Sequence, residues 1–217
     1  AVRVPRKQLL SRFLDFQGDG IISPKPKTQH LAYNTLIGER LQALSEAASS
    51  AGQAAVIATR YALVRRQGPT NPQIIDFQVQ QTTLLSILCS SIVLTTVHAT
   101  LMPSWEQAIP RAATAPSLAG DWHSTAASLK AFWCWWSLES VEQSRRTLGG
   151  HAFSAFNAIA GIWGDSIVLT TGGGDNYVLA QQASRYLLKS YATGRKFGAS
   201  ITYLKKAQTY KTFALAW

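Results

Sequence analysis

One stretch of the sequence constrains the fold more than any other. From His30 to Arg66 the chain contains no proline, and its apolar residues recur at intervals of three and four. These residues are Leu36, Ile37, Leu41, Leu44, Ala48, Ala51 and Ala55. Such spacing places the side chains on one face of an α-helix, so the pattern predicts a helix of about ten turns.

Glycine and proline divide the following part of the chain. Gly68–Pro72 is a break, because these residue types favour turns and interrupt helices. A second apolar helix is predicted from about Gln73 to Met102. Residues 103–121 are predicted to be a linker loop, because they contain three prolines: Pro103, Pro110 and Pro116.

A third helix is predicted from about His123 to Leu148, ending at a pair of glycines. It carries large aromatic residues on nearly all sides, which is typical of a buried helix: Phe132, Trp133, Trp135 and Trp136. A glycine-rich loop at 172–174 precedes a fourth helix, from about Asn176 to Thr193, and a shorter helix is expected at the end of the chain.

These segments predict an all-α fold, a bundle of long helices that occupies residues 29–217. Residues 1–28 are rich in proline, glycine and charge, and predict a short non-helical lead-in made of a strand end followed by a loop. The sequence contains no internal repeat and no alternation of strands and helices that would indicate a parallel sheet.

Composition excludes several classes of protein. Hydrophobic residues make up 47% and charged residues 15% of the chain, so it can bury a core and is not mainly disordered. Two cysteines exclude a disulfide scaffold, and the Cys and His spacing predicts no metal site.

The net charge is +10, and seven basic but no acidic residues follow Asp175. This is either a solvated basic face or a surface for an anionic partner; we expect no nucleic acid, because no nucleic-acid-binding motif accompanies the charge.

The segment from Leu84 to Met102 is nineteen residues long and has no formal charge. Its hydroxyl groups and His98 favour a buried helix of the bundle over a transmembrane span, so we expect no transmembrane segment. The chain does not begin with Met, and its first residues lack the apolar core of a signal peptide, which indicates a processed or partial product.

Three features could bind an anion. The segment from Gly172 to Asn176 opens a helix, where free backbone N–H groups suit a phosphate, but a plain helix-entry turn is an equal interpretation. The pair Gly149 and Gly150 is either a helix C-cap or a close approach to a ligand. Arg145 and Arg146 are either a solvated helix end or a phosphate clamp. No Ser-His-Asp nucleophile pattern is present.

Four ordered motifs resemble the acyl-CoA oxidase and acyl-CoA dehydrogenase superfamily. The segment Arg145–Phe153 resembles the Arg-Arg-x-x-Gly-Gly-His-Gly-Tyr motif of acyl-CoA oxidases. Three further stretches look like this family: Val64–Gln67 with Pro72–Gln81, Gly174–Asn176 with Gln181–Tyr191, and Val2–Arg6, which is similar to the strand that leaves the family's middle β-domain. The resemblance covers residues 1–195, and it implies the family's C-terminal helical portion, from a split, cleaved or partial protein.

The resemblance implies a cofactor and partners. The cofactor is FAD, shared across a dimer, and Arg65 matches the family's pyrophosphate-contacting arginine. Five further residues match positions near the cofactor: Gln78, Arg146, Gly149, Gly150 and Asn176. A complementing chain or segment would supply the N-terminal α and β domains in a homo- or hetero-oligomer. The substrate would be an acyl-CoA or related thioester, and the compartment peroxisomal, another intracellular one or mitochondrial.

The catalytic base is where the sequence departs from the family. The usual Glu, which removes the α-proton while the β-hydride goes to the flavin, falls at Gly173. A few superfamily members carry the base on the first long helix, in a Glu-Arg-Leu sequence 26 residues before the matching arginine. Here Glu39, followed by Arg40 and Leu41, lies 26 residues before Arg65. We therefore expect Glu39 to be a buried, relocated base and Asp175 to be a helix cap.

Two alternatives remain open at this stage. The chain could be a catalytically inactive structural subunit that keeps the fold after losing the usual Glu. It could instead be part of a flavoenzyme that acts on a substrate other than a CoA ester.

Overall fold

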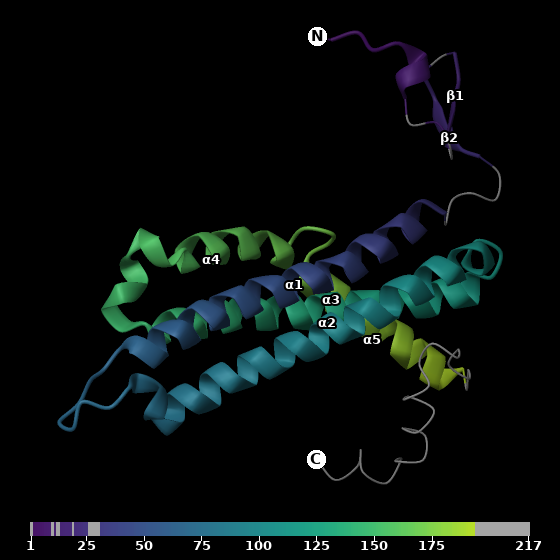
Figure 1. The fold of residues 1–217 in the computed structure, drawn as a ribbon. Coiled ribbons are helices and arrows are strands. Elements are labelled where there is room, and N and C mark those ends of the chain that lie inside the picture. Colours follow the sequence, from purple (N-terminus) through teal and green to yellow (C-terminus); the bar gives the residue numbers. More distant parts are fainter. Residues whose placement is uncertain (1, 10, 12–13, 19, 26–30, 194–217) are drawn as a thin grey trace.

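The computed structural model describes residues 2–9, 11, 14–18, 20–25 and 31–193. Five α-helices lie in this part of the chain: α1 (Leu31–Val64), α2 (Gln78–Ala112), α3 (Pro116–Thr147), α4 (Ile159–Ile167) and α5 (Asn176–Ala192). The three longest run side by side, α4 lies along one end of the bundle and α5 packs on α3 (Figure 1). The all-α bundle is therefore confirmed.

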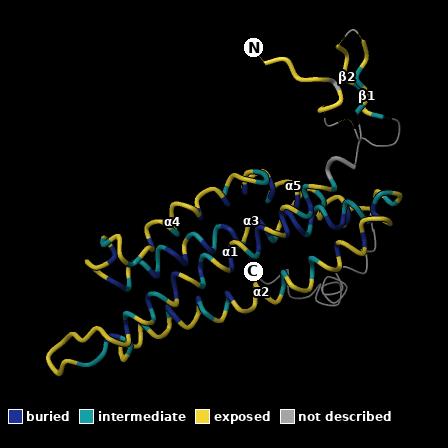
Figure 2. Tube along the Cα trace, turned by 45° about the horizontal axis from the view of Figure 1, so that its top comes forward, coloured by how far each residue is buried: buried dark blue, intermediate teal, exposed yellow. Residues whose placement is uncertain are grey.

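Short elements precede and connect the helices. Near the N-terminus, β1 (Leu14–Phe16) pairs antiparallel with β2 (Ile22–Pro24), with Asp15 opposite Ser23. Five 3-10 turns complete the described elements: η1 (Arg6–Gln8), η2 (Ile74–Asp76), η3 (Gly149–Phe153), η4 (Ala155–Asn157) and η5 (Val168–Thr170). The lead-in thus contains a hairpin where we expected a single strand end, and it lies apart from the bundle in both views (Figures 1 and 2).

Small residues let the long helices approach closely. Along α1, Ala47, Ala51, Ala54 and Ala58 are fully buried, and the dark stripe in Figure 2 follows this face. On α3 the buried positions are also mostly small, and the hydroxyl of Ser137 donates to the Ala47 carbonyl over 2.8 Å. Alanine buries little area itself, but it allows two helix backbones to come near each other and exclude water.

The expectation that the aromatic residues bury α3 on all sides is wrong. Phe132 is 61% exposed, and Trp133, Trp135 and Trp136 are only partly buried. Near these positions the buried face of α3 is formed by Ala127, Ala131, Cys134 and Ser137 instead, while the core holds two other indole rings, those of Trp105 and Trp122. The aromatic side chains pack against one another at the edge of the helix.

The linker loop expected at 103–121 is also wrong. Helix α2 continues through Pro103 and Pro110 to Ala112, and α3 begins at Pro116. Both internal prolines are exposed, whereas Trp105, Ala108 and Ala112 keep an apolar face in helical register against the core. This packing outweighs the hydrogen bond that each proline removes. A proline at the start of α3 is favourable, because the first helical N–H has no partner in any case.

Within the described residues, α2 is the one helix long and apolar enough to cross a membrane by length and composition. We expected this stretch to be a buried bundle helix, but only 22% of its most apolar window is buried. The helix packs on α1 and α3 through one face and exposes the other. Length and composition alone do not distinguish a membrane span from a bundle helix of this kind.

Two parts of the chain after α3 remain to be compared with the sequence-based predictions. The region between Gly149 and Gly172 contains α4 and three 3-10 turns that hydrophobic periodicity did not predict, because each is too short to show a period. The short helix expected at the C-terminus and the basic residues after Thr193 lie outside the described residues.

Candidate functional site

The glycine loop, defined as residues Gly172–Asn176, forms the entry to α5. Gly173 and Gly174 have φ angles of 66° and 114°, which glycine adopts more readily than any residue with a Cβ. Asp175 caps the helix, because its Oδ1 accepts from the N–H of Tyr177 at 2.9 Å and of Val178 at 3.4 Å. The interpretation of Asp175 as a helix cap is therefore confirmed.

Beside this loop, the structure brings Glu39 and Gly173 together. A Cβ atom at Gly173 would lie 3.4 Å from Oε1 of Glu39. The two residues line a cavity of about 230 Å³, which we call the Glu39 pocket. Its lining residues are Glu39, Arg40, Gln42, Ala43, Glu46, Lys130, Val168, Leu169, Gly172 and Gly173. The carboxylate thus occupies the space into which a side chain at position 173 would extend.

Glu39 is exposed in this chain, so the expectation that its apolar neighbours bury it is wrong. Each helical residue is rotated by about 100° from the last, and Glu39 therefore lies roughly 200° around α1 from both Ile37 and Leu41. Those two side chains enter the core, with 1% and 0% of their surface exposed. Glu39 points instead to the open side of α1, toward the glycine loop.

Arg40 crosses from α1 to the loop and to α3. Its Nε donates to the Gly173 carbonyl at 3.1 Å, and its Nη1 lies 3.0 Å from Nδ1 of His123. A guanidinium only donates, so Nδ1 accepts and the Nε2–H of His123 is directed to the side-chain oxygen of Gln182, 3.3 Å away. Burial and the Arg40 charge lower the pKa of His123, which agrees with this neutral tautomer. Burial likewise lowers the pKa of Arg40, while Glu39 raises it.

Asn176 lies beneath the loop rather than at the surface. It is fully buried, and its Oδ1 accepts a hydrogen bond of 2.8 Å from Nζ of Lys130. In this conformation its side chain is closed off from a ligand bound outside the bundle. Its assignment as a cofactor contact stays a prediction, whereas its contact with Lys130 is a structural one.

A second site, the arginine groove, lies where α1 and α3 end and α2 begins. It encloses about 540 Å³ and brings together Arg65, Arg146 and Gly149, three of the residues predicted to contact the cofactor. The other lining residues are Tyr61, Gln67, Gly68, Pro69, Ile74, Phe77, Val79, Gln80, Thr147 and Leu148. Gln78 and Gly150 are exposed and adjoin lining residues in the chain, but they do not themselves line the groove.

Gly149 ends α3 as the sequence suggested. It follows the C-cap residue Leu148 and has a φ angle of 58°, the left-handed conformation that commonly closes a helix. Apart from Gly149 and its two chain neighbours, no atom of the described residues lies within 4 Å of the place where a Cβ would be, so the backbone here is open to the groove. The C-cap and close-approach interpretations are therefore compatible at this glycine.

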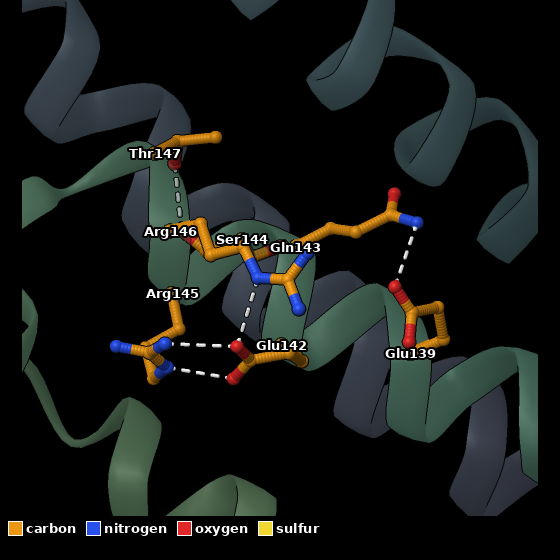
Figure 3. A network of polar contacts seen from close by, with 7 residues as sticks. All are labelled: Glu139, Glu142, Gln143, Ser144, Arg145, Arg146 and Thr147. Carbon is orange, nitrogen blue, oxygen red and sulfur yellow. Dashed lines mark hydrogen bonds and ion pairs between the residues drawn. The ribbon is translucent and has the colours of Figure 1, made fainter.

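The arginine pair at the end of α3 shares one carboxylate, that of Glu142 (Figure 3). Arg145 binds it through Nε at 2.6 Å and Nη2 at 2.8 Å, and its guanidinium lies 5.7 Å from the Phe153 ring centre. Arg146 uses only Nε, at 2.9 Å, and among the described residues its two terminal NH₂ groups have no partner. Arg145 is thus committed to Glu142, whereas Arg146 can still bind a ligand. We call this pair of contacts, from Arg145 and Arg146 to Glu142, the fork. The sequence analysis did not predict it, although a Glu that lies three and four residues before two arginines is its signal.

The fork gives a prediction for pH dependence. The hydrogen bond from Arg145, together with Arg146, lowers the pKa of Glu142 from its ordinary 4.5 to about 2. Because the folded-state pKa is depressed, the fork stabilises the fold above pH 4.5, and its contribution is lost as the pH falls toward 2. The free energy of unfolding of the Glu142→Gln variant should therefore be lower than that of wild type by up to about 1 kcal/mol at neutral pH, as for exposed ion pairs. The two free energies should converge in acid.

Glu139→Gln is the matched control, because Glu139 lies one turn earlier and, within the described part of the chain, its carboxylate accepts only from the Gln143 amide, at 3.2 Å (Figure 3). Thermal unfolding between pH 2 and pH 7 measures the stability of wild type and of the two variants. An equal pH dependence in Glu142→Gln and Glu139→Gln would mean that the fork contributes nothing.

The two sites are far apart along one helix. Glu39 lies in α1, and Arg65 directly follows its last residue. The 26 positions between them correspond to roughly 39 Å at 1.5 Å per residue. The Glu39 pocket and the arginine groove therefore lie near opposite ends of α1. Among the described residues, no group of three or more His, Cys, Asp or Glu side chains could bind a metal ion.

Comparison with known proteins identifies the family of this fold. The family model "Acyl-CoA oxidase, C-alpha1 domain" matches residues 33–188, which include nearly all of α1, the whole of α2 to α4, most of α5 and both sites. The chain belongs to the acyl-CoA oxidase family. It is similar to peroxisomal acyl-coenzyme A oxidase 1 of Phascolarctos cinereus, with 32% identity over 93% of this chain and 32% of that protein. The human protein of the same name is 31% identical over 87% of this chain and 29% of its own length.

Solved structures of acyl-CoA oxidases have the same fold. The tomato enzyme LeACX1 superimposes with a TM-score of 0.85 and 28% identity, over 96% of this chain and 33% of its own. Acyl-CoA oxidase-2 of Caenorhabditis elegans, solved bound with FAD, ascaroside-CoA and ATP, gives a TM-score of 0.79 and 29% identity over 88% of this chain and 30% of its own. The chain thus spans about a third of the length of the relatives that it matches.

Proposed function

We propose that this chain forms the C-terminal helical part of an FAD-dependent acyl-CoA oxidase in which Glu39 removes the α-proton of the acyl thioester. The observation that carries this proposal is the 3.4 Å separation between Oε1 of Glu39 and the position of a Cβ at Gly173. Position 173 is where the family resemblance places the usual base. A carboxylate from α1 is therefore next to the space that the usual carboxylate would enter.

The loop conformation also suits this exchange of position. The φ angle of Gly173, 66°, disfavours a residue with a side chain, and such a side chain would meet Glu39. The aliphatic side chains of Val168 and Leu169 line the same pocket and provide apolar surface for an acyl chain. When bound, FAD supplies the acceptor for the β-hydride. Glu39 takes the α-proton on its carboxylate oxygen, so that loss of both hydrogens leaves an α,β double bond.

The arginine groove has the chemistry that a diphosphate requires. Arg65 and Arg146 supply positive charge and N–H donors, and Gly149 presents backbone without a side chain. The roughly 39 Å between Arg65 and Glu39 fits a cofactor that is shared between subunits, as the resemblance implies. One chain would then contact the FAD of its neighbour through the groove while Glu39 acts in its own subunit.

This proposal requires partners, because the chain spans only about a third of its relatives. We propose that segments equivalent to their remaining domains complete the FAD and acyl-CoA sites, and that two such units associate. The relatives that carry the name peroxisomal suggest the same compartment for this protein.

Gly173 itself favours a second candidate, a catalytically inactive subunit that retains the fold. The experiment that separates the two uses the assembled protein, purified with its complementing domains. We expect a yellow preparation whose visible flavin absorbance is bleached by an acyl-CoA in the absence of oxygen. A colourless protein favours the structural subunit, and a yellow protein that no acyl-CoA bleaches points to a flavoenzyme with another substrate.

A further inference from the structure

Lys130, on α3, is fully buried, yet neither of its hydrogen-bond partners is a carboxylate. Its Nζ donates to the Gly174 carbonyl at 2.7 Å and to Oδ1 of Asn176 at 2.8 Å. Removing an ammonium group from water is unfavourable unless other groups replace its hydration. Burial, and to a lesser extent the Arg40 charge, lower the pKa of Lys130, while Cys134 and, more weakly, the Asp175 and Glu39 carboxylates raise it. An apolar residue would avoid the cost of burying an ammonium group, but it would leave the Gly174 carbonyl and Oδ1 of Asn176 without this donor, so the role of the lysine lies in these two contacts.

The glycine loop supplies that explanation, because it is the part of the site with the least intrinsic order. Three successive glycines, Gly172 to Gly174, lose more backbone entropy on ordering than any other residues would. They have no side chains through which the loop could pack. The loop can therefore be fixed only through its backbone groups and through the residues that flank it.

Two cations bind consecutive carbonyl groups of this loop. Nε of Arg40 binds the carbonyl of Gly173, and Nζ of Lys130 binds that of Gly174. Because each peptide unit is planar, fixing its carbonyl fixes the orientation of the whole unit. Arg40 ties the loop to the turn of α1 that carries Glu39, and Lys130 ties it to α3. The distance between Gly173 and Glu39 thus depends on both contacts.

We propose that Lys130 is a positioning residue that fixes the glycine loop against Glu39 and so keeps the loop wall of the pocket at a constant distance from the base. This inference rests on the proposed function of Glu39, but the order of the loop can be measured without any reaction. The lysine acts through the loop and does not touch the reacting atoms. Its charge-assisted hydrogen bonds replace the packing that a loop of glycines cannot provide.

The test compares Lys130→Met with wild type in the assembled, flavin-loaded protein. Methionine has a similar length and keeps the volume, but it donates no hydrogen bond. Hydrogen–deuterium exchange of the peptide 172–178 should become about tenfold faster or more, while exchange in α3 stays unchanged. The limiting rate of flavin reduction should fall by roughly 10-fold to 100-fold, as expected when a reacting group is displaced by about 1 Å. The half-saturating acyl-CoA concentration should change little.

Lys189→Met is the control, because Lys189 is an exposed lysine on α5. Lys130→Gln retains one donor group and should give intermediate exchange, which covers the case in which the methionine variant does not assemble. Unchanged exchange at 172–178 in both Lys130 variants would overturn the proposal. Faster exchange spread equally through α3 would also overturn the proposal, because Lys130 would then only stabilise the fold. Faster exchange of the loop with an unchanged rate of flavin reduction would overturn it as well. A loosened loop in a protein whose wild-type flavin no acyl-CoA reduces would overturn the proposed acyl-CoA oxidase function and leave the contact between Lys130 and the loop supported.

Discussion

Replacing Glu39 by glutamine should lower the rate at which an acyl-CoA bleaches the flavin by about 10²–10⁴-fold, the usual contribution of a general base. Glutamine keeps the size of the side chain and its ability to form hydrogen bonds, but it cannot accept the α-proton. The content of bound flavin should not change, because the arginine groove lies roughly 39 Å away along α1. Stopped-flow absorbance under anaerobic conditions measures the rate, and the visible spectrum before mixing measures the flavin.

Two carboxylates near Glu39 provide matched controls. Glu46 lines the same pocket two turns further along α1, and Asp175 caps α5 at the end of the glycine loop. Glu46→Gln should leave the reduction rate within a few-fold of wild type. Asp175→Asn keeps a capping oxygen and should affect mainly stability. If Glu39→Gln reduces flavin at the wild-type rate, Glu39 is not the base, and a large loss in one of the control variants would identify the carboxylate that is.

The long helices could be predicted from the sequence because their signals are local. Apolar spacing located α1 to within a few residues of its observed bounds, Leu31–Val64, and the glycines at 149 and 172–174 marked the end of α3 and the start of α5. The error at Pro103 and Pro110 arose because a proline argues against a helix only locally. Burial of Trp105 and Ala108 on the opposite face decided the outcome, and that packing depends on α1.

The candidate site was only partly predictable for the same reason. Sequence spacing related Glu39 to Arg65, but its contact with the glycine loop joins residues more than 130 positions apart, and only the fold brings them together. The roles of Lys130 and His123 had no local signal, since a single lysine or histidine within a helix is uninformative. Asn176 was proposed as a cofactor contact from its motif, whereas its burial against Lys130 became evident only in three dimensions.

Alanine substitution of Arg65 or Arg146 should each weaken FAD binding by roughly ten- to a hundredfold, because a hydrogen bond to a charged group contributes about 1.5–3 kcal/mol. Arg146 is oriented by Glu142 through Nε alone, which leaves its terminal NH₂ groups available for a diphosphate oxygen. Titration of the flavin-free assembled protein with FAD measures the affinity. Both losses should shrink at high salt, which screens charges on an open groove.

The control for this prediction is Arg111→Ala, because Arg111 lies in the last turn of α2 and the groove lies at the first. The arrangement of the two sites makes the outcome specific. At saturating FAD, the Arg65 and Arg146 variants should reduce flavin at nearly the wild-type rate, since Glu39 is unchanged, whereas Glu39→Gln should bind FAD normally and react slowly. Unchanged FAD affinity in both arginine variants would mean that these side chains are solvated charges. Loss of rate together with affinity would mean that the groove and the Glu39 pocket are coupled, contrary to their separation along α1.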